Sequence, residues 1–377
     1  MIYFDHNATT PVLSEVREAM VPYLNEEWGN PSSIYRFGAR LKAKIENARS
    51  EVADLIGAES SQQIIFTSGG TESNNAAIHS ASLSSPKKRH IITSQVEHSS
   101  VLSYCRFLEE HQGFRVTYLP VDEFGLISLT DLDTAIRPDT ALVSLMWANN
   151  ETGVLFPVGE IANLCHSRGV LYHCDGVQAL GKITMDIRNM AIDFISISGH
   201  KIGAPKGVGA LYIKKSTPYI PFLHGGHQEQ SRRGGTESIS HIVGFGVAAA
   251  ISRSNLPSYA AFVGALRDTL EEGMLKQFPF SRINGHKTQR LANTANIAIR
   301  GLDSDIVLTF LDGHEICASS GSACMASALS PSHVIAAMSK SHDRASESVR
   351  FSLSISNTEC EVSRTLEMLS QLSVLLG

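Results

Sequence analysis

From about residue 60 to residue 215, short apolar segments alternate with segments that have the apolar spacing of helices. This alternation predicts a mostly parallel sheet covered by helices, because parallel strands need a long crossover between them. In such a sheet, ligands bind at the carboxyl ends of the strands, so the residues after each strand are the first candidates for a site. The predicted strands are residues 63–67, 90–93, 116–119, 141–146, 170–174, 194–197 and 209–213, and residues 158–166, opened by Pro157, are typical of the intervening helices.

The length of the chain, 377 residues, allows a large domain and a smaller second one. A Pro/Ser segment at 255–258 indicates the edge of the first domain, and the residues after it read as a helix, strands and a closing helix from residue 358. We expect a large domain of residues 13–256. The small domain is expected to combine residues 1–12 with residues 257–377, with the first dozen residues sharing its sheet.

Composition excludes several classes of protein. With 43% hydrophobic residues, 18% charged residues and a net charge of −5, the chain is not expected to bind nucleic acid directly or a membrane surface. It has no apolar run of membrane-spanning length and no secretory signal at its start. Its six cysteines form no CxxC pair, which indicates neither a zinc site nor a disulfide framework and favours a reducing compartment, hence the cytoplasm. The spacing of His224 and His227 could suggest a metal, but no carboxylate or thiolate accompanies them, so we expect no metal site.

Glycines followed by a hydroxyl mark the segment after the first predicted strand. Gly69, Gly70 and Thr71 precede a helix-like run that includes Ala76 and Ile78. Free backbone N–H groups and the helix dipole at such a start favour a phosphate. A plain N-capping turn explains the pattern equally well. The segment is not a P-loop, because no Lys-Ser or Lys-Thr pair follows the glycines.

Two other strand ends carry a titratable side chain whose role these residues leave open. Asp175 follows the strand at 170–174 and could cap a helix, ligate Mg²⁺ or pair with a protonated heterocycle. His98 lies beyond the strand at 90–93 and could stack on an aromatic ring and transfer protons near neutral pH. A histidine that simply lies near a helix N-terminus is the plainer interpretation of His98.

The sharpest motif surrounds Lys201, between the last two strands of the alternating region. Ser198, His200 and several glycines flank this lysine, and such residues pack poorly but suit a buried amine. Desolvation and a neighbouring cation lower the pKa of a lysine, which makes the amine a nucleophile toward an aldehyde. A solvated turn lysine is the alternative, and Lys206 is expected to be one.

A phosphate-binding turn, an acid, a histidine and an amine at one edge of a sheet together describe a pyridoxal phosphate site. Asp175 would keep the pyridine nitrogen protonated, which makes the ring an electron sink, and Lys201 would hold the aldehyde as a Schiff base. Each motif alone is modest, and their appearance together in this order is the stronger signal.

One cysteine, Cys324, lies in a segment of small and polar residues that offers little apolar packing for a buried thiol. Cys324 is part of Ser-Ser-Gly-Ser-Ala-Cys-Met-Ala-Ser, residues 319–327. A structural cysteine packs like a small hydrophobe in an apolar element, so this one is interpreted as presented for chemistry.

Along essentially its whole length, the chain resembles the NifS/IscS-type cysteine desulfurases. The matching motifs, in order, are DHNATTP, GNPSS, TSGGTESNN, EHSSV, NNETG, DGVQALGK, SGHKIGAPKGVGALYI, RRGGTES, SSGSACMAS and VRFSLS. The resemblance implies an α/β fold of the fold-type I, aspartate-aminotransferase-like class of pyridoxal-phosphate-dependent transferases, within the class V aminotransferase family. It also implies a homodimer.

The resemblance assigns cofactor roles residue by residue. It makes Lys201 the lysine that holds pyridoxal phosphate, with Asp175 and Gln178 facing the pyridine nitrogen and the ring hydroxyl, and His98 stacked on the ring. It assigns the phosphate to Gly70, Thr71, Ser198 and His200, joined by Thr236 of the partner subunit.

The resemblance also assigns substrate and catalytic roles. Asn150 is implied to contact the substrate or the hydroxyl side of the ring, and Arg350 to clamp the substrate carboxylate with its planar two-pronged donor. Lys201 is implied to remove the Cα proton, and His98 to act as acid and base on the substrate thiol. Cys324, in the small domain, matches the nucleophile that accepts sulfur.

The implied activity is the removal of sulfur from L-cysteine, giving L-alanine and a persulfide on Cys324. The stretch from Cys324 to Arg350 resembles the longer-loop branch, which passes the persulfide to a sulfur-acceptor protein such as an iron–sulfur scaffold or a thiolation protein. Ser238 stands where many members carry Asn, and Met325 where a smaller residue is common, so the preferred acceptor stays open.

Two alternatives remain at this point. A selenocysteine lyase or another fold-type I pyridoxal phosphate aminotransferase would need Lys201 but not Cys324. A scaffold without catalysis that binds sulfur-carrier proteins would need neither residue, nor Asp175 or His98.

Overall fold

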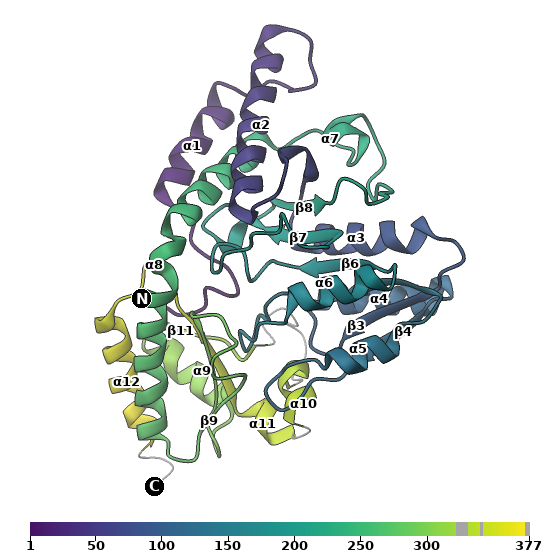
Figure 1. Ribbon diagram of the computed structural model, residues 1–377. Coiled ribbons are helices and arrows are strands. Elements are labelled where there is room, and N and C mark those ends of the chain that lie inside the picture. The colour runs from purple at the N-terminus through teal and green to yellow at the C-terminus, as the bar shows by residue number, and fades with distance from the viewer. Residues whose placement is uncertain (322–330, 340–341, 374–377) are drawn as a thin grey trace.

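The computed structural model describes residues 1–321, 331–339 and 342–373. Its central feature is a seven-stranded sheet in the order β2-β8-β7-β6-β5-β3-β4 (Figure 1). Strand β8 runs antiparallel to both of its neighbours, β2 and β7, and the other pairs are parallel. The predicted α/β fold with a mixed, mostly parallel sheet is therefore confirmed. The strands are β2 (Ile64–Thr67), β3 (His90–Ser94), β4 (Arg115–Leu119), β5 (Thr140–Ser144), β6 (Leu171–Asp175), β7 (Phe194–Ser198) and β8 (Gly209–Ile213).

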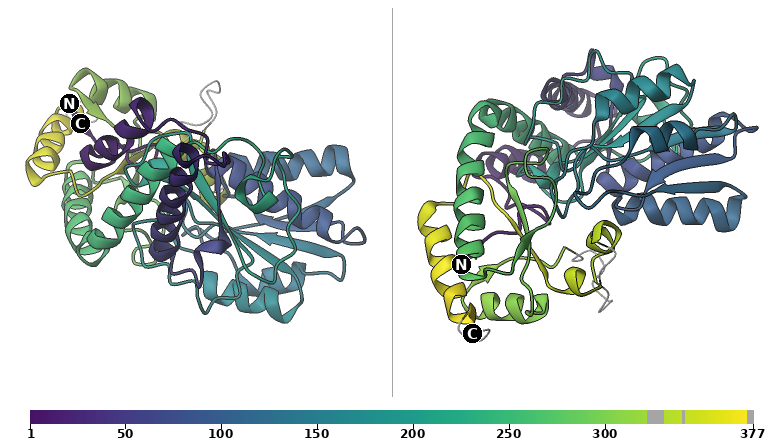
Figure 2. Two further views of the ribbon diagram at one scale, coloured as in Figure 1. Left: turned by 90° about the horizontal axis from the view of Figure 1, so that it is seen from above. Right: turned by 60° about the horizontal axis from the view of Figure 1, so that its bottom comes forward.

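The sheet is buried on both faces because its strands are apolar at odd and even positions alike. In β2, Ile64 and Phe66 pack into one core cluster and Ile65 into another. Successive side chains of a strand point to opposite faces, so the two clusters are the two faces of the sheet. Helices cover both faces (Figure 2). The first face is covered by α1 (Ser14–Asn25), α2 (Arg36–Ile56), α5 (Leu129–Ala135), α6 (Val158–Ser167) and the start of α8 (Ile239–Gln277), and the second by α3 (Gly70–Ser84) and α4 (Ser99–Gln112).

A separate hydrophobic core joins the two ends of the chain. Ile2 and Phe4 are buried in it with Phe351 and Leu369. Strands β9, β10 and β12 form an antiparallel sheet, and β1 pairs in parallel with β11. The elements here are β1 (Ile2–Tyr3), β9 (Arg282–Ile283), β10 (Thr294–Ala298), α9 (Ser304–Gly313), β11 (Ile316–Cys317), β12 (Ser348–Ser352) and α12 (Glu359–Ser373). Helices α10 (His333–Ser339) and α11 (His342–Ser346) lie between them in sequence but pack their buried residues into the first core. This core supports the proposed small domain, whose boundaries stay a prediction.

Helix α8 connects the two cores, as Figure 1 shows. It has 39 residues and contains Pro257 in its interior. The helix continues through residues 255–258, so the domain edge predicted there does not coincide with a break in secondary structure. Phe245 packs against the large sheet and Leu270 in the second core, so burial at both ends holds the helix together despite the proline.

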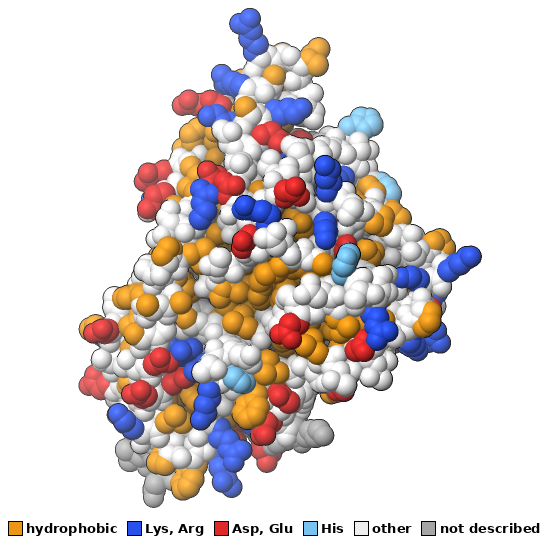
Figure 3. Space-filling view, in the orientation of Figure 1, with side chains coloured by type: hydrophobic (Ala, Val, Ile, Leu, Met, Phe, Trp, Pro, Cys, Tyr) orange, Lys and Arg blue, Asp and Glu red, His pale blue; other side chains and the backbone are white. Residues whose placement is uncertain are grey.

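Among the described residues, no helix combines the length and the apolar character needed to cross a bilayer. Side chains of both charge signs are interspersed on the face shown in Figure 3. That face therefore carries no broad stripe of one sign that would attract a polyanion.

Candidate functional site

A cavity of about 220 Å³ lies where the carboxyl ends of β6 and β7 meet the starts of α3 and α4. Asn7 and Ala8 from the start of the chain and Arg350 from β12 complete its wall. The cavity brings together the predicted residues Gly70, Thr71, His98, Asn150, Asp175, Gln178, Ser198, His200, Lys201 and Arg350. Their roles toward a cofactor or substrate stay predictions, and what the structure adds is that they line one cavity.

Lys201 reaches the cavity from a short 3-10 turn, residues Gly199–Lys201, directly after β7. Its Nζ donates hydrogen bonds to the backbone carbonyls of Asn7 at 2.6 Å and of Ala8 at 2.8 Å. The first residues of the chain therefore hold the amine in place by their backbone, which local sequence pattern did not indicate.

Asp175 is the last residue of β6, and its carboxylate is held from two sides. Oδ1 accepts the backbone N–H of Val177 at 3.0 Å, and Oδ2 accepts Nδ2 of Asn74 at 2.7 Å. Asn74 Nδ2 also donates to Ser100 Oγ at 2.8 Å. Among the described residues, Oδ1 of Asn74 is buried without a hydrogen-bond partner. The carboxylate is thus oriented by α3, and an unused acceptor lies next to it.

The start of α3 leaves room for a ligand to approach the backbone closely. Gly69 is the N-cap and makes no side-chain capping hydrogen bond. A Cβ added at Gly70 would lie 2.8 Å from Cγ2 of Val177, so only glycine fits there without a shift. Backbone N–H groups at an uncapped helix start, beside Thr71 and Ser198, can bind an anion.

His98 lies both at a helix N-terminus and in the cavity wall, the two positions that the sequence left open. It is the N-cap of α4, where Nδ1 accepts the backbone N–H of Ser100 at 3.2 Å, and it lines the cavity. Ser100 Oγ lies 2.8 Å from the same nitrogen. Because Nδ1 accepts, the proton of the neutral imidazole resides on Nε2.

His200 is a neutral donor or acceptor in the cavity wall. Burial and the charge of Lys201 lower its pKa to about 4. Its Nδ1 lies 3.2 Å from Oγ1 of Thr9. At neutral pH the ring therefore carries no charge, and it contributes hydrogen bonding to the site instead.

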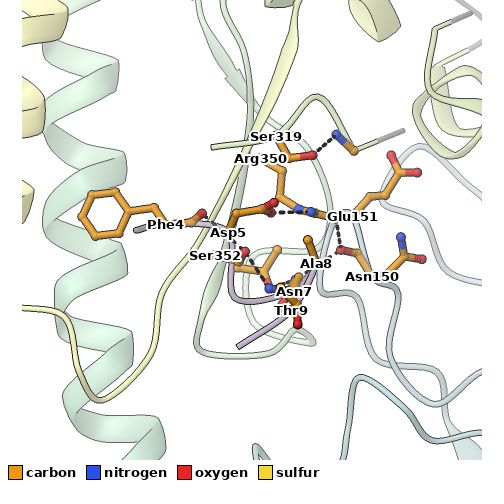
Figure 4. Close-up of polar contacts among 12 residues, drawn as sticks. Phe4, Asp5, Asn7, Ala8, Thr9, Asn150, Glu151, Ser319, Arg350 and Ser352 are labelled. Atoms are coloured by element: carbon orange, nitrogen blue, oxygen red, sulfur yellow. Dashed lines mark hydrogen bonds and ion pairs between the residues drawn. The ribbon is translucent and has the colours of Figure 1, made fainter. Parts of the chain in front are cut away.

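Arg350 extends from β12 into the cavity and is almost fully buried (Figure 4). Nη1 donates to the carbonyl of Asn150 at 2.9 Å, and Nη2 donates to Oδ1 of Asp5 at 2.6 Å. Within the described part of the chain, its Nε has no hydrogen-bond partner. The guanidinium is therefore fixed in orientation, and its Nε–H is a buried donor without a partner among the described residues.

Of the two remaining predicted site residues, only Thr236 is among the described residues. Thr236 lines a different pocket, with Ser68, Glu229 and Arg233. Cys324 lies outside the described residues. Gly321, the last described residue before it, lines the cavity.

Sequence reasoning missed several side chains that the site uses. Asp5, Asn7, Asn74 and Lys182 hold Arg350, Asp175 and Gln178, and no role was assigned to them. All four lie inside motifs that carried the resemblance, DHNATTP, TSGGTESNN and DGVQALGK. Their position as polar residues within those motifs could have indicated that they support the site. Over the described ranges, no group of three His, Cys, Asp or Glu side chains is placed to hold a metal ion.

Comparison with known proteins covers the whole chain. The model of the aminotransferase class-V family matches residues 2–365. Cysteine desulfurase 2 of Trichormus variabilis is 47% identical over 369 residues, which is 98% of this chain and 92% of that protein. Cysteine desulfurase NifS of Azotobacter vinelandii is 45% identical over 97% of this chain and 90% of its own length.

A solved structure of a NifS-like protein superposes with a TM-score of 0.93 at 34% identity, covering 99% of each chain. The resemblance to NifS/IscS-type enzymes and the fold-type I class are thereby confirmed. With its lysine, carboxylate and arginine at one cavity, the chain belongs to the aminotransferase class-V family, among the relatives of the NifS-type cysteine desulfurases.

Proposed function

We propose that this chain is a pyridoxal-phosphate-dependent cysteine desulfurase. In the overall reaction, the Cβ–S bond of L-cysteine breaks, Cβ gains a proton, and the sulfur forms an S–S bond with the enzyme thiol. L-Cysteine and a thiol thus become L-alanine and a persulfide, with no external oxidant or reductant. The observation that carries the proposal is a single cavity lined by Lys201, Asp175, His98 and Arg350, with Gly321 on its wall.

The residues of the cavity fit pyridoxal phosphate. The uncapped start of α3, where Gly70 leaves no room for a Cβ, suits the phosphate, together with Thr71 and Ser198. Asp175, oriented by Asn74, suits a protonated ring nitrogen. When bound, this group supplies an electron sink for the bonding electrons at the substrate Cα.

Arg350 orients the substrate. Its guanidinium is held by Asp5 and Asn150, and Nε faces no protein acceptor among the described residues. A substrate carboxylate that reaches this N–H gains a charge-assisted hydrogen bond in a buried setting. The α-carbon of cysteine is thereby directed toward Lys201.

Lys201 and His98 move protons in the proposed reaction. The Lys201 amine takes the proton from Cα of the substrate, and the Asn7 and Ala8 carbonyls hold Nζ in position for this transfer. His98 exchanges a proton with the substrate thiol at Nε2, since Nδ1 is occupied by Ser100.

Cys324 is the proposed sulfur acceptor. A thiolate is the reactive form of cysteine, and the persulfide that it forms is the species proposed to pass to an acceptor protein of iron–sulfur assembly or thiolation. The names of the similar proteins, which include NifS and IscS, support this assignment. A cytoplasmic location remains a prediction from cysteine usage.

A homodimer is proposed as the working form. Trp28, Ile34 and Tyr35 are exposed large hydrophobics near the junction of α1 and α2, a surface that a second copy would cover. The neighbouring pocket joins Pro31 to Glu229, which also lines the pocket of Thr236. Thr236 therefore lies on the side where a second copy is expected, and not in its own cavity.

The deciding experiment incubates the purified protein with pyridoxal phosphate, L-cysteine and a thiol reductant, and measures alanine and sulfide. Equal amounts of both products are expected. Lys201→Ala should lose the lysine–cofactor absorbance and turnover, whereas Cys324→Ser should keep the absorbance and release no sulfide. Full sulfide release by Cys324→Ser would instead support a lyase. Transamination without sulfide would support an aminotransferase, and a colourless protein that binds no cofactor would support a scaffold.

A further inference from the structure

A second lysine is buried beside the site and has no part in the mechanism above. Lys182 is 5% exposed and lies in the turn after β6, seven positions beyond Asp175. Among the described residues, no ion pair joins it to a carboxylate. A buried lysine without a counter-ion is costly, so its retention in the fold calls for a specific role.

Lys182 donates to two side-chain amides. Nζ lies 2.7 Å from Oε1 of Gln178 and 2.9 Å from Oδ1 of Asn7. An amide whose oxygen accepts from a lysine must turn its NH₂ group the other way. Lys182 therefore orients the Gln178 amide, and it shares the orientation of the Asn7 amide with Asn293, whose Nδ2 donates to the same Oδ1 at 2.9 Å.

These orientations define donors and acceptors around the cavity. Gln178 Nε2 donates to the backbone carbonyl of Asn7 at 3.0 Å and, because Gln178 lines the cavity, carries a second N–H for a ligand. Asn7 Nδ2 donates to Thr294 Oγ1 at 2.9 Å and to the Asn150 carbonyl at 3.2 Å.

The Asn7 carbonyl connects this network to the reactive amine. It accepts both Gln178 Nε2 and, at 2.6 Å, Lys201 Nζ. A substitution at Lys182 therefore affects the hydrogen bonds of Lys201 through a single intervening residue, Asn7. No direct contact between the two lysines is required.

The protonation of Lys182 fits this arrangement. Burial, and then the charges of Lys201 and Arg350, lower its pKa well below the ordinary value. A neutral amine has two N–H donors, and two amide oxygens lie within hydrogen-bond distance. An ammonium would carry a third donor and repel the two cations nearby.

We propose that Lys182 is a positioning residue that orients the Gln178 amide, so that its Nε2 donor faces the cofactor's ring oxygen. This inference rests on the proposed function, because it concerns the same site. A donor at the ring oxygen stabilises negative charge there. Loss of that donor should raise the pH at which the lysine–cofactor absorbance changes to its deprotonated form.

The test uses Lys182→Met, which keeps much of the side-chain volume but has no donor. Lys182→Gln, which keeps an N–H donor, is the conservative variant, and Lys206→Met on the exposed turn is the control. Each protein is loaded with pyridoxal phosphate and its absorbance is titrated from pH 6 to pH 10. Lys182→Met should shift the midpoint upward by about one pH unit, Lys182→Gln by less, and Lys206→Met should match the wild type.

A midpoint for Lys182→Met that equals the wild-type value would overturn the proposal, even if its melting temperature fell, because the lysine would then be structural only. If Lys182→Met does not fold, Lys182→Ala takes its place, because it also removes the donor, and an unchanged midpoint for that variant would count against the proposal. Failure of the wild-type protein to bind pyridoxal phosphate would instead refute the proposed function, so the two failures are distinguishable.

Discussion

Arg350 and Asp5 form an ion pair in the wall of the cavity, with Nη2 2.6 Å from Oδ1 and the arginine side chain only 3% exposed. Asp5 comes from the start of the chain and Arg350 from β12, near its end. The pair fixes the plane of the guanidinium before any substrate arrives. In the proposed function, recognition of the substrate carboxylate by Arg350 therefore depends on a residue that is far away in sequence.

Removing the Asp5 acceptor should weaken substrate binding. Asp5→Ala leaves Nη2 without its partner, which removes a charge-assisted hydrogen bond of about 1.5–3 kcal/mol. If this energy is lost from substrate binding, the KM for L-cysteine rises about 10- to 100-fold. Asp5→Asn keeps a hydrogen-bond acceptor and should raise KM only a few-fold. Steady-state alanine formation measures both, and equal KM values for the two variants would contradict this role.

Replacing Arg350 with lysine should not preserve function. A lysine ammonium cannot contact Asp5, Asn150 and a carboxylate with the fixed fork of a guanidinium. We expect Arg350→Lys to raise KM about 100-fold while the cofactor absorbance stays unchanged, since Arg350 is assigned to substrate and not to cofactor. A variant with wild-type KM would show that the substrate carboxylate binds elsewhere.

A buried ion pair supports the segment that leads to Thr236. Arg49 Nη1 lies 2.5 Å from Oε2 of Glu229, and their side chains are 4% and 3% exposed. The same carboxylate oxygen accepts the backbone N–H of Phe66 at 2.8 Å. Glu229, Gln230 and Ser231 all have positive φ values, so this turn is strained and depends on the pair.

Glu229→Gln should therefore destabilise the fold by about 3 kcal/mol, because it removes the buried carboxylate and leaves Arg49 only its contact with the partly exposed Glu46 at 3.3 Å. Urea unfolding of the cofactor-free protein measures the loss. Glu51→Gln is the matched control, since its pair with Arg253 is exposed and contributes about 0–1 kcal/mol. Equal losses for the two variants would show that burial does not strengthen the first pair.

Glu97 predicts a pH dependence of stability. Burial raises its pKa from 4.5 to about 8, with the nearby Asp175 adding to the shift. The unfolded chain releases this proton near pH 4.5 and the folded chain near pH 8, so Glu97 lowers stability as pH rises through that interval. The loss is on the order of a few kcal/mol.

Glu97→Gln removes this titration while keeping a side-chain oxygen for Ser94 and Met146. The variant should gain stability relative to wild type as pH increases from 5 to 9, measured by urea unfolding. Glu160→Gln on the exposed face of α6 should show a difference that does not change with pH. A constant difference for Glu97→Gln as well would show that Glu97 is ionised in the folded protein at neutral pH.

Much of the sheet and the site could be predicted because both depend on patterns of residues that are close together in the sequence. Continuous apolar runs gave all seven strands, and the polar residues that follow them, such as Asp175 and Lys201, line one cavity. The contributions of Asp5 and Asn7 could not be predicted in this way. They reach the site through contacts with Arg350, Ser352 and Thr294, which no local pattern encodes.

The continuity of α8 through Pro257 could not be predicted from local sequence either. Pro257 removes one N–H from the helix, which usually ends or kinks it. Here, apolar residues on both sides are buried in different cores, and that tertiary packing outweighs the local preference.

The backbone N–H of Asn7 donates to Ser352 Oγ, and the side chain of Asn7 donates to Thr294 Oγ1, so the acceptors that hold Lys201 are anchored by residues made more than 280 positions later. A ribosome makes a chain from its N-terminus, and domains generally fold as they emerge. On a growing chain, Asn7 therefore waits for β10 and β12 before it reaches its final position. A chain truncated before β12 would present Lys201 without this anchor.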